Sequence, residues 1–132
     1  MTDKNIYQKI QEVRVQLQNM NLKKTGKNTY SSFSYYELRD FLPQLNNLML
    51  SNDIMTAFSI VKTSEVEEAV LEVFNSSKPE EKVDFRLPTA EVEIGKKKDG
   101  TGGAEPIQNL GGKATYMRRY MMMIAFEIIE SD

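Results

Sequence analysis

Apolar residues recur at helical spacing near the N-terminus of the chain. Alternating steps of four and three residues separate Ile6, Ile10, Val13, Leu17 and Met20. This spacing places them on one face of an amphipathic helix, which we predict at residues 3–21. Because the same spacing forms a heptad seam, the face could pair with another chain, although packing within its own domain is the usual outcome.

A second helix is predicted at residues 36–50. Ser34 and Glu37 form a capping-box pattern in front of it, and Pro43 inside it is expected to bend the helix. The positions expected to face inward are Leu38, Phe41, Leu42, Leu45, Leu48 and Met49. The aromatic and serine-rich residues just before this helix predict an irregular extended segment.

Three segments in the middle of the chain are typical of β-strands. "IMTAFSIVK", residues 54–62, is apolar on both alternating faces, which predicts a central strand. Residues 66–74 fit either a strand or a helix, and we favour the strand because turn-forming residues lie on both sides of them. Residues 82–88 alternate most cleanly between apolar and charged positions, and residues 90–94 could continue that strand after a bend.

A segment rich in lysine and glycine, residues 95–105, predicts a flexible loop, and a last helix is expected at residues 112–130. Strands that follow one another after short turns form an antiparallel meander. We therefore predict an α+β fold in which two N-terminal helices and a long C-terminal helix pack on a meander of three or four strands. The length of the chain, residues 1–132, suits one domain.

The last helix is apolar on two sides. At 100° per residue, an expected core stripe contains Lys113, Met117, Tyr120, Met121, Ile124 and Ile128. Met122, Met123 and Phe126 fall on or beside the opposite side. We expect one domain of this size to cover only one side, which predicts a subunit interface at these three residues.

The amino-acid composition excludes several kinds of chemistry. The chain has no cysteine and no histidine, which rules out disulfides, thiolate nucleophiles, Cys-bound zinc and Ser-His nucleophile activation. Asp84, Glu91, Glu93 and Lys96 could resemble a metal-dependent nuclease site, but this pattern is common on protein surfaces. We therefore expect neither catalysis nor a bound metal or cofactor.

The chain also lacks signals for membrane insertion. Its first ten residues have no apolar core of the signal-peptide type. The longest apolar run, residues 121–126, is far shorter than the roughly 20 residues of a membrane span. These features favour a cytoplasmic protein without membrane contact.

Charge is distributed unevenly although the net charge is −2. Residues 1–35 hold six basic and two acidic residues, and residues 94–126 hold the same numbers. Residues 64–93 hold three basic and nine acidic residues. The overall acidity argues against nucleic acid as a partner, whereas the two basic blocks allow it unless they are only solvated faces.

The stretch "GGKATYMRRYMMMIAF", residues 111–126, resembles a signature of phage ERF (essential recombination function) single-strand annealing proteins. That signature is Gly-x-x-x-Thr/Ser-Tyr-x-Arg-Arg-Tyr. The residues that match it are Gly111 or Gly112, Thr115, Tyr116, Arg118, Arg119 and Tyr120. "GKNTYSSFSYYELRDFLPQLNNLMLSNDI" is similar to a second family segment, in which aromatic residues precede a helix with an internal proline. The lysine-rich residues 95–105 have no counterpart in the resemblance.

The resemblance implies a ring or filament that binds single-stranded DNA without ATP and pairs complementary strands. It also implies a fold like the core of the annealing recombinases, action in the bacterial cytoplasm, and a phage or host single-strand binding protein as a further partner. The DNA contacts expected from it come from Arg118, Arg119, Lys113, Tyr116, Lys96, Lys97, Lys98, Lys23, Lys24 and Lys27. Two alternatives stay open: a protein that coats single strands without annealing them, and a structural oligomer that does not bind DNA.

Overall fold

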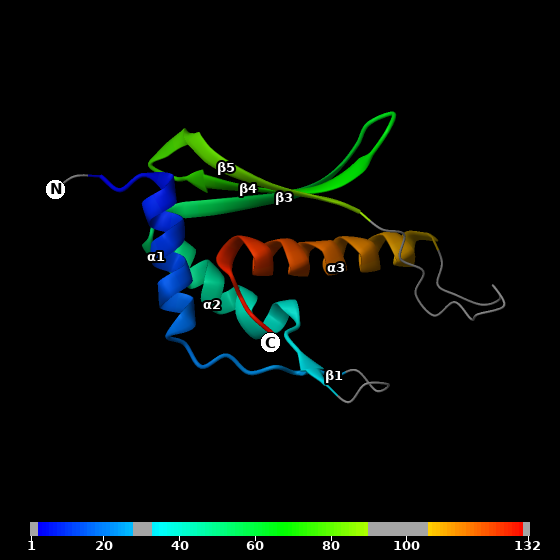
Figure 1. Cartoon of the computed structure of the whole chain (residues 1–132), viewed down its shortest axis with the longest axis horizontal. Coiled ribbons are helices and arrows are strands. Elements are labelled where there is room, and N and C mark those ends of the chain that lie inside the picture. The colour runs from blue at the N-terminus through cyan, green and yellow to red at the C-terminus, as the bar shows by residue number, and fades with distance from the viewer. Residues whose placement is uncertain (1–2, 28–32, 90–105, 131–132) are drawn as a thin grey trace.

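A computed structural model describes residues 3–27, 33–89 and 106–130 of the chain (Figure 1). The elements are α1 (Ile6–Gln18), β1 (Gly26–Lys27), β2 (Ser34–Tyr35), α2 (Leu38–Ser51), β3 (Ile54–Lys62), β4 (Glu67–Asn75), β5 (Lys78–Pro88) and α3 (Pro106–Phe126). The α+β prediction is confirmed, since three helices accompany antiparallel sheets of three and two strands within these ranges. The predictions for residues 90–94 and 95–105 fall outside the described residues.

The larger sheet has the strand order β3-β4-β5. Its register places Ala57 opposite Glu72, and Glu72 opposite Asp84. The prediction of a strand at residues 66–74 is confirmed by β4, but the prediction that residues 54–62 form a central strand is wrong. In a meander the middle strand of the sequence is the middle strand of the sheet, so β3 lies at an edge. Met55 and Val61 of β3, opposite Phe74 and Glu68 on the outer face, are exposed.

The three helices lie on one face of this sheet, and the opposite face carries charges. Inward residues of β5 pack against the core, as their alternation predicted: Val83, Phe85 and Leu87. On the outer face, Lys82 pairs with Glu72 at 2.6 Å, and Arg86 lies 3.8 Å from Glu68. Three acidic residues of the block, Glu68, Glu72 and Asp84, therefore lie on an outer surface that points away from the helices.

The first helix is shorter than predicted. Asn5 caps α1 by accepting a hydrogen bond from the Gln8 backbone N–H at 2.8 Å, and Gln8 returns the contact to the Asn5 N–H. The helix ends at Gln18, so Met20 lies beyond it and is partly exposed. The four remaining apolar residues of the predicted face are buried in the core.

A polar cluster joins α1 to the sheet. The buried Lys9 ammonium donates a hydrogen bond to Asn75 Oδ1 at 2.6 Å, and Asn75 donates to Glu81 at 3.1 Å. Glu81 also accepts a hydrogen bond from the Ile6 N–H at the start of α1. The hydrogen bonds from Asn75 and Ile6 hold the pKa of Glu81 below its ordinary value, which favours the charged form beside Lys9.

The start of α2 differs from the prediction. Glu37, not Ser34, is the residue before the first turn, and Asp40 accepts a hydrogen bond from the Glu37 N–H at 2.9 Å. Ser34 is unavailable for capping because it pairs with Lys27 in the small β1–β2 sheet. Pro43 is inside the helix, as predicted, on its exposed side. The inward positions are confirmed, with Phe41, Leu45 and Met49 buried.

The last helix begins at Pro106 and ends at Phe126, so it starts six residues earlier and ends four residues earlier than predicted. Glu127 has a φ of 56°, in the left-handed region, and turns the chain out of the helix. Residues 127–130 then run back beside the helix toward the start of α2 (Figure 1).

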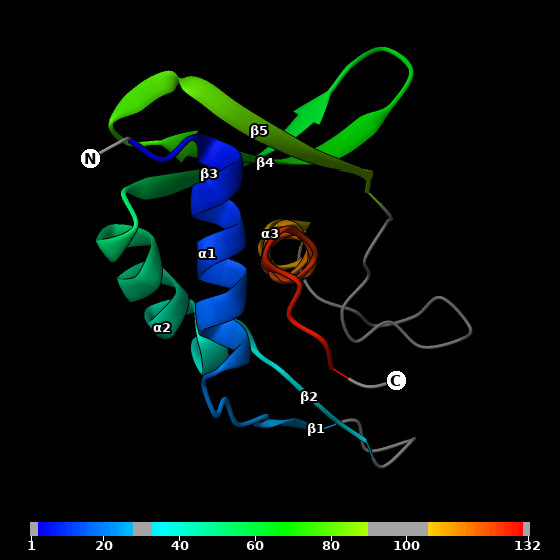
Figure 2. The ribbon, with the colours of Figure 1, turned by 60° about the vertical axis from the view of Figure 1, so that its left-hand side comes forward.

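The prediction that Met122, Met123 and Phe126 need a second subunit to cover them is wrong. All three are buried within the single chain, with 1%, 7% and 0% of their surface exposed. The reason is that the sheet covers one side of α3 while α1 lies along another, as the view along α3 shows (Figure 2). The returning residues 127–130 lie beside part of the remaining surface, where Ile124 stays exposed.

Candidate single-stranded DNA interface

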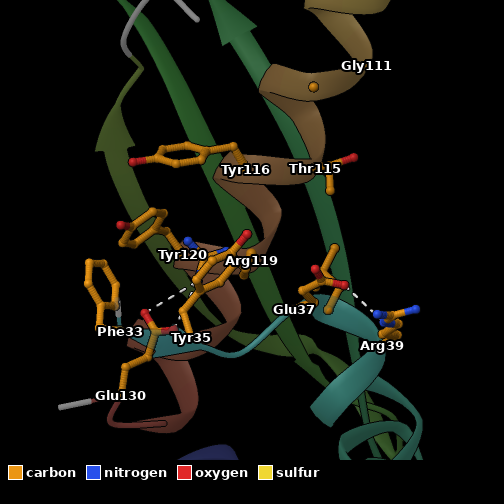
Figure 3. Close-up of a pocket in the computed structure, with 12 residues that line it drawn as sticks. Phe33, Tyr35, Glu37, Arg39, Gly111, Thr115, Tyr116, Arg119, Tyr120 and Glu130 are labelled. Atoms are coloured by element: carbon orange, nitrogen blue, oxygen red, sulfur yellow. Dashed lines mark hydrogen bonds and ion pairs between the residues drawn. The ribbon is translucent and has the colours of Figure 1, made fainter. Parts of the chain in front are cut away.

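A cleft of about 840 Å³ lies between α3 and residues 33–39 (Figure 3). Residues 33–39 meet α3 on the side that faces away from the larger sheet (Figure 1). Figure 3 shows aromatic rings gathered along one side of the cleft and the Glu37–Arg39 pair on the other. The rings belong to Phe33, Tyr35, Tyr116 and Tyr120. The cleft thus combines both segments that carry the family resemblance.

Arg119 lies at the floor of the cleft and its charge is used within the fold. Its guanidinium is 3.3 Å from the Glu130 carboxylate and donates a hydrogen bond to the Tyr36 carbonyl at 3.1 Å. Three tyrosine rings surround it, with centroids at 4.7 Å for Tyr120, 5.2 Å for Tyr35 and 5.8 Å for Tyr116. Only 12% of the Arg119 side chain is exposed. Through these contacts Arg119 holds the two walls of the cleft together.

Tyr116 and Tyr120 form a tilted ring pair one helical turn apart. Their centroids are 4.7 Å apart and their planes meet at 55°. The hydrogen bond to Tyr120 and burial both raise the pKa of Tyr116, so its phenol is neutral at physiological pH. Tyr116 is nevertheless 44% exposed and Phe33 is 52% exposed, which leaves aromatic surface open to solvent at the mouth of the cleft.

The β1–β2 pair sets the position of Tyr35. Gly26 pairs with Tyr35, and a Cβ atom added at Gly26 would come within 2.6 Å of three atoms of the tyrosine ring. The ring can therefore lie against this backbone only because residue 26 is a glycine. The same packing directs Tyr35 toward Arg119.

Asp40 fixes the start of α2 at the edge of the cleft. Its carboxylate accepts hydrogen bonds from the Thr25 N–H at 2.9 Å, the Thr25 hydroxyl at 2.7 Å and the Glu37 N–H at 2.9 Å. Burial alone would raise the pKa of the Asp40 carboxyl, but these hydrogen bonds outweigh burial and lower the pKa below its ordinary value. Charged Asp40 therefore stabilises the fold.

We expect Asp40→Asn to lower the free energy of unfolding by about 1–3 kcal/mol near neutral pH, because an amide cannot accept all of these bonds. Because the pKa of Asp40 is lowered in the folded state, its carboxylate stabilises the fold when the pH is above the ordinary aspartate pKa of about 3.9. This stabilisation is lost as the pH falls through the pKa of the folded state. The difference between the variant and the wild type should thus shrink in urea titrations below about pH 4. A difference that does not change between neutral and acidic pH would contradict this role of the Asp40 charge.

The predicted DNA-contacting residues separate into three groups. Arg118, Lys23 and Lys27 are exposed, and no hydrogen bond or ion pair joins their side chains to other residues in the described ranges. Lys24 and Lys113 are engaged, as is Arg119: Lys24 donates to the Glu130 carbonyl and lies over the Tyr36 ring, and Lys113 pairs with Glu67 on β4. Lys96, Lys97 and Lys98 fall outside the described residues.

The two arginines of the "RR" pair therefore differ in environment. Successive helical residues point about 100° apart, which places Arg118 outside the cleft while Arg119 points into it. Thr115, which lines the cleft, is three residues before Arg118, so Arg118 flanks the rim on that side. Lys27 lies in β1, next to the other wall of the cleft. Its backbone pairs with Ser34, which stands between the two cleft residues Phe33 and Tyr35.

Sequence reasoning missed several residues of the cleft. Phe33, Tyr35 and Arg39 were not among the expected DNA contacts, and Tyr120 was expected in the core stripe of α3. The clustering of aromatic residues at 30–36 was a signal, but nothing local shows that this segment meets α3. Glu130 could not have been found, since its position depends on the reversal of the chain at Glu127.

Other kinds of site find no support in the described ranges. They contain no cluster of three or more acidic residues placed to hold a metal ion. No helix in them is both long and apolar enough to span a bilayer.

A comparison with protein families matches residues 6–132 to the ERF superfamily. No curated protein and no solved structure matches the chain. The family match covers nearly the whole chain, including the cleft and the helix that bears both arginines. It supports a general role in phage recombination and strand annealing, and it shows that the chain belongs to the ERF superfamily.

Proposed function

We propose that this protein binds single-stranded DNA and anneals complementary strands without ATP, as an oligomer in a phage recombination system. The observation that carries the proposal is the arrangement of charge and aromatic surface around α3. Among the described residues, Arg118 and Lys27 have exposed side chains without an ion pair and lie next to residues of a cleft with open tyrosine and phenylalanine rings. Lys23, on the loop between α1 and β1, is a further exposed cation without an ion pair. The acidic outer face of the sheet lies on the opposite side of α3 (Figure 1).

This arrangement resolves the conflict between an acidic chain and a polyanionic partner. Lysine and arginine side chains attract phosphates, and the release of counterions makes such binding strongly dependent on salt. On the outer sheet face the three carboxylates of Glu68, Glu72 and Asp84 are paired with only two cations, Lys82 and Arg86, so this group has a net negative charge and does not attract DNA. A strand is therefore directed to the cleft side of the molecule.

Binding through phosphates and base stacking, without base-specific contacts, would suit annealing. An annealing protein has to bind any sequence, because the incoming strand and not the protein reads the bases. Aromatic rings stack on every base with little sequence preference, and exposed cations bind the phosphates that all sequences share. We propose that the protein is not an enzyme and that it binds and anneals strands without a cofactor or a metal ion.

Assembly into a ring or filament is part of the proposal and rests on the family resemblance. Each subunit offers few unpaired cations in its described ranges, so a single site is expected to be weak. Several subunits along one strand would bind with an avidity well above that of one site. The contact between subunits has to use surface other than the buried Met122, Met123 and Phe126. We place this activity in the host cytoplasm, with a phage or host single-strand binding protein as a further partner.

A strand-annealing assay tests the proposal. Two complementary oligonucleotides, one carrying a fluorophore and the other a quencher, are mixed with the protein without ATP at low and high salt. Faster quenching at low salt supports annealing, whereas binding without acceleration favours a coating protein. A chain that neither binds nor anneals single strands favours the structural oligomer and contradicts the proposal.

Arg118→Ala is expected to weaken single-strand binding while the protein stays folded. Loss of one phosphate contact should reduce the slope of log affinity against log salt by about 0.7 for each bound subunit. Fluorescence anisotropy over a salt series measures this slope. Arg86→Ala is the matched control, because Arg86 is half exposed on the outer sheet face. Equal losses for both variants, or none for Arg118→Ala, would contradict the expected binding face.

A further inference from the structure

We propose that the aromatic cleft binds a nucleobase of the single strand, while the phosphates remain at the rim. This inference rests on the proposed function and assigns the cleft interior a ligand of its own. Each subunit would hold one base in its cleft, and the neighbouring bases would stay outside the cleft.

The charges inside the cleft argue against a phosphate there. The cation at the floor, Arg119, is already paired with Glu130 at 3.3 Å and is nearly buried. Arg39 at the other wall is paired with Glu37 at 2.9 Å. A phosphate in the cleft would meet two carboxylates and no unpaired cation among the described lining residues. An uncharged planar ring meets no such repulsion.

The surface of the cleft fits a base. Tyr116 presents an exposed ring next to Tyr120, and Phe33 and Tyr35 approach from the other segment (Figure 3). Arg119 holds Tyr35, Tyr116 and Tyr120 in place, so the surface is largely formed before a ligand arrives. Its volume of about 840 Å³ is within the range of ligand sites, which leaves room for a base with its sugar.

The unpaired cations are placed for the flanking phosphates. Arg118 flanks the cleft on the α3 side, and Lys27 lies beside Ser34 on the β2 side. A nucleotide whose base enters the cleft would keep its phosphates at the mouth, near these side chains. The anchored base is withdrawn from pairing, so annealing would have to release it as the duplex extends.

The test compares two fluorescent oligonucleotides with the same number of phosphates. One is oligodeoxythymidine, and the other carries abasic tetrahydrofuran residues in place of most bases. The wild-type protein is expected to bind the normal strand about tenfold more tightly or better, since each stacked base contributes on that scale. Tyr116→Ala should lose about tenfold in affinity for the normal strand and little for the abasic strand. Tyr116→Phe keeps the ring and should bind like the wild type.

Two controls separate this inference from the proposed function. Arg118→Ala should weaken binding of both oligonucleotides by the same factor, because it acts on phosphates. Tyr7→Ala removes an exposed ring on α1, away from the cleft, and should leave the affinity for both oligonucleotides unchanged. If the wild type binds both strands equally, or Tyr116→Ala weakens both equally, the base site is refuted while DNA binding stands. If neither strand binds, both the proposed function and this inference are refuted.

Discussion

Replacing Met122 with glutamate is expected to unfold the protein. Met122 is 1% exposed within the single chain, so the new carboxylate would be buried without a partner in the apolar core. The combined cost of the buried polar group and lost packing is expected to exceed about 5 kcal/mol, which is as large as the whole stability of many domains. Circular dichroism and thermal melting should show loss of the cooperative transition.

Ile124→Glu is the matched control for Met122→Glu. Ile124 is two residues further along the same helix but is 45% exposed, so its carboxylate can stay hydrated. This variant should melt within a few degrees of the wild type. If Met122→Glu instead stays folded and only lowers the mass of an oligomer, the burial of Met122 within one chain is wrong and a subunit interface at this residue is restored.

Arg119→Ala is expected to destabilise the fold by about 2–4 kcal/mol. The neighbouring residue Arg118 is not expected to contribute in this way. Replacing Arg119 leaves the Glu130 carboxylate and the Tyr36 carbonyl without their donor and removes the cation that three tyrosine rings surround. Chemical denaturation measures this loss. Arg118→Ala should change the stability by less than about 0.5 kcal/mol, because Arg118 is an exposed side chain.

A double-mutant cycle isolates the ion pair. Glu130→Gln removes the charge that Arg119 neutralises, so Arg119→Ala should cost less in that background than in the wild type. A strictly additive result would show that the pair contributes no coupling. If Arg119→Ala melts like the wild type yet loses DNA affinity, then Arg119 contacts DNA directly, and its structural role is secondary.

The regular elements could be predicted because their patterns are local. Alternation along residues 82–88 and helical spacing in α1 and α2 depend only on which residues face the core. The strand at residues 66–74 could be chosen over a helix because turns on either side limit its length. The predicted ends of the helices were less accurate. Ser34 was expected to cap α2 but pairs with Lys27 in the β1–β2 sheet, and the left-handed backbone at Glu127 ends α3 earlier than expected.

The candidate site could be predicted only in part. The helical wheel shows that α3 is apolar on two sides, but it cannot show how many layers of the same chain surround it. Here Met122 and Phe126 are buried within the single chain, in which the sheet and α1 both contact α3. Likewise, the 100° angle between Arg118 and Arg119 predicts different environments, but only the folded positions of Tyr36 and Glu130 decide which arginine is buried.

Mapping of DNA cross-links tests the central claim most directly, namely that a single strand binds at the aromatic cleft beside α3. An oligonucleotide containing 5-iodouracil is bound to the wild-type protein and irradiated, and the linked peptides are identified by mass spectrometry. We expect links to the aromatic residues of the cleft, with Tyr116 and Phe33 foremost because their rings are open to solvent. Links confined to the outer face of β4 and β5 would contradict the account, as would a bound strand that never cross-links to residues 33–36 or 115–120.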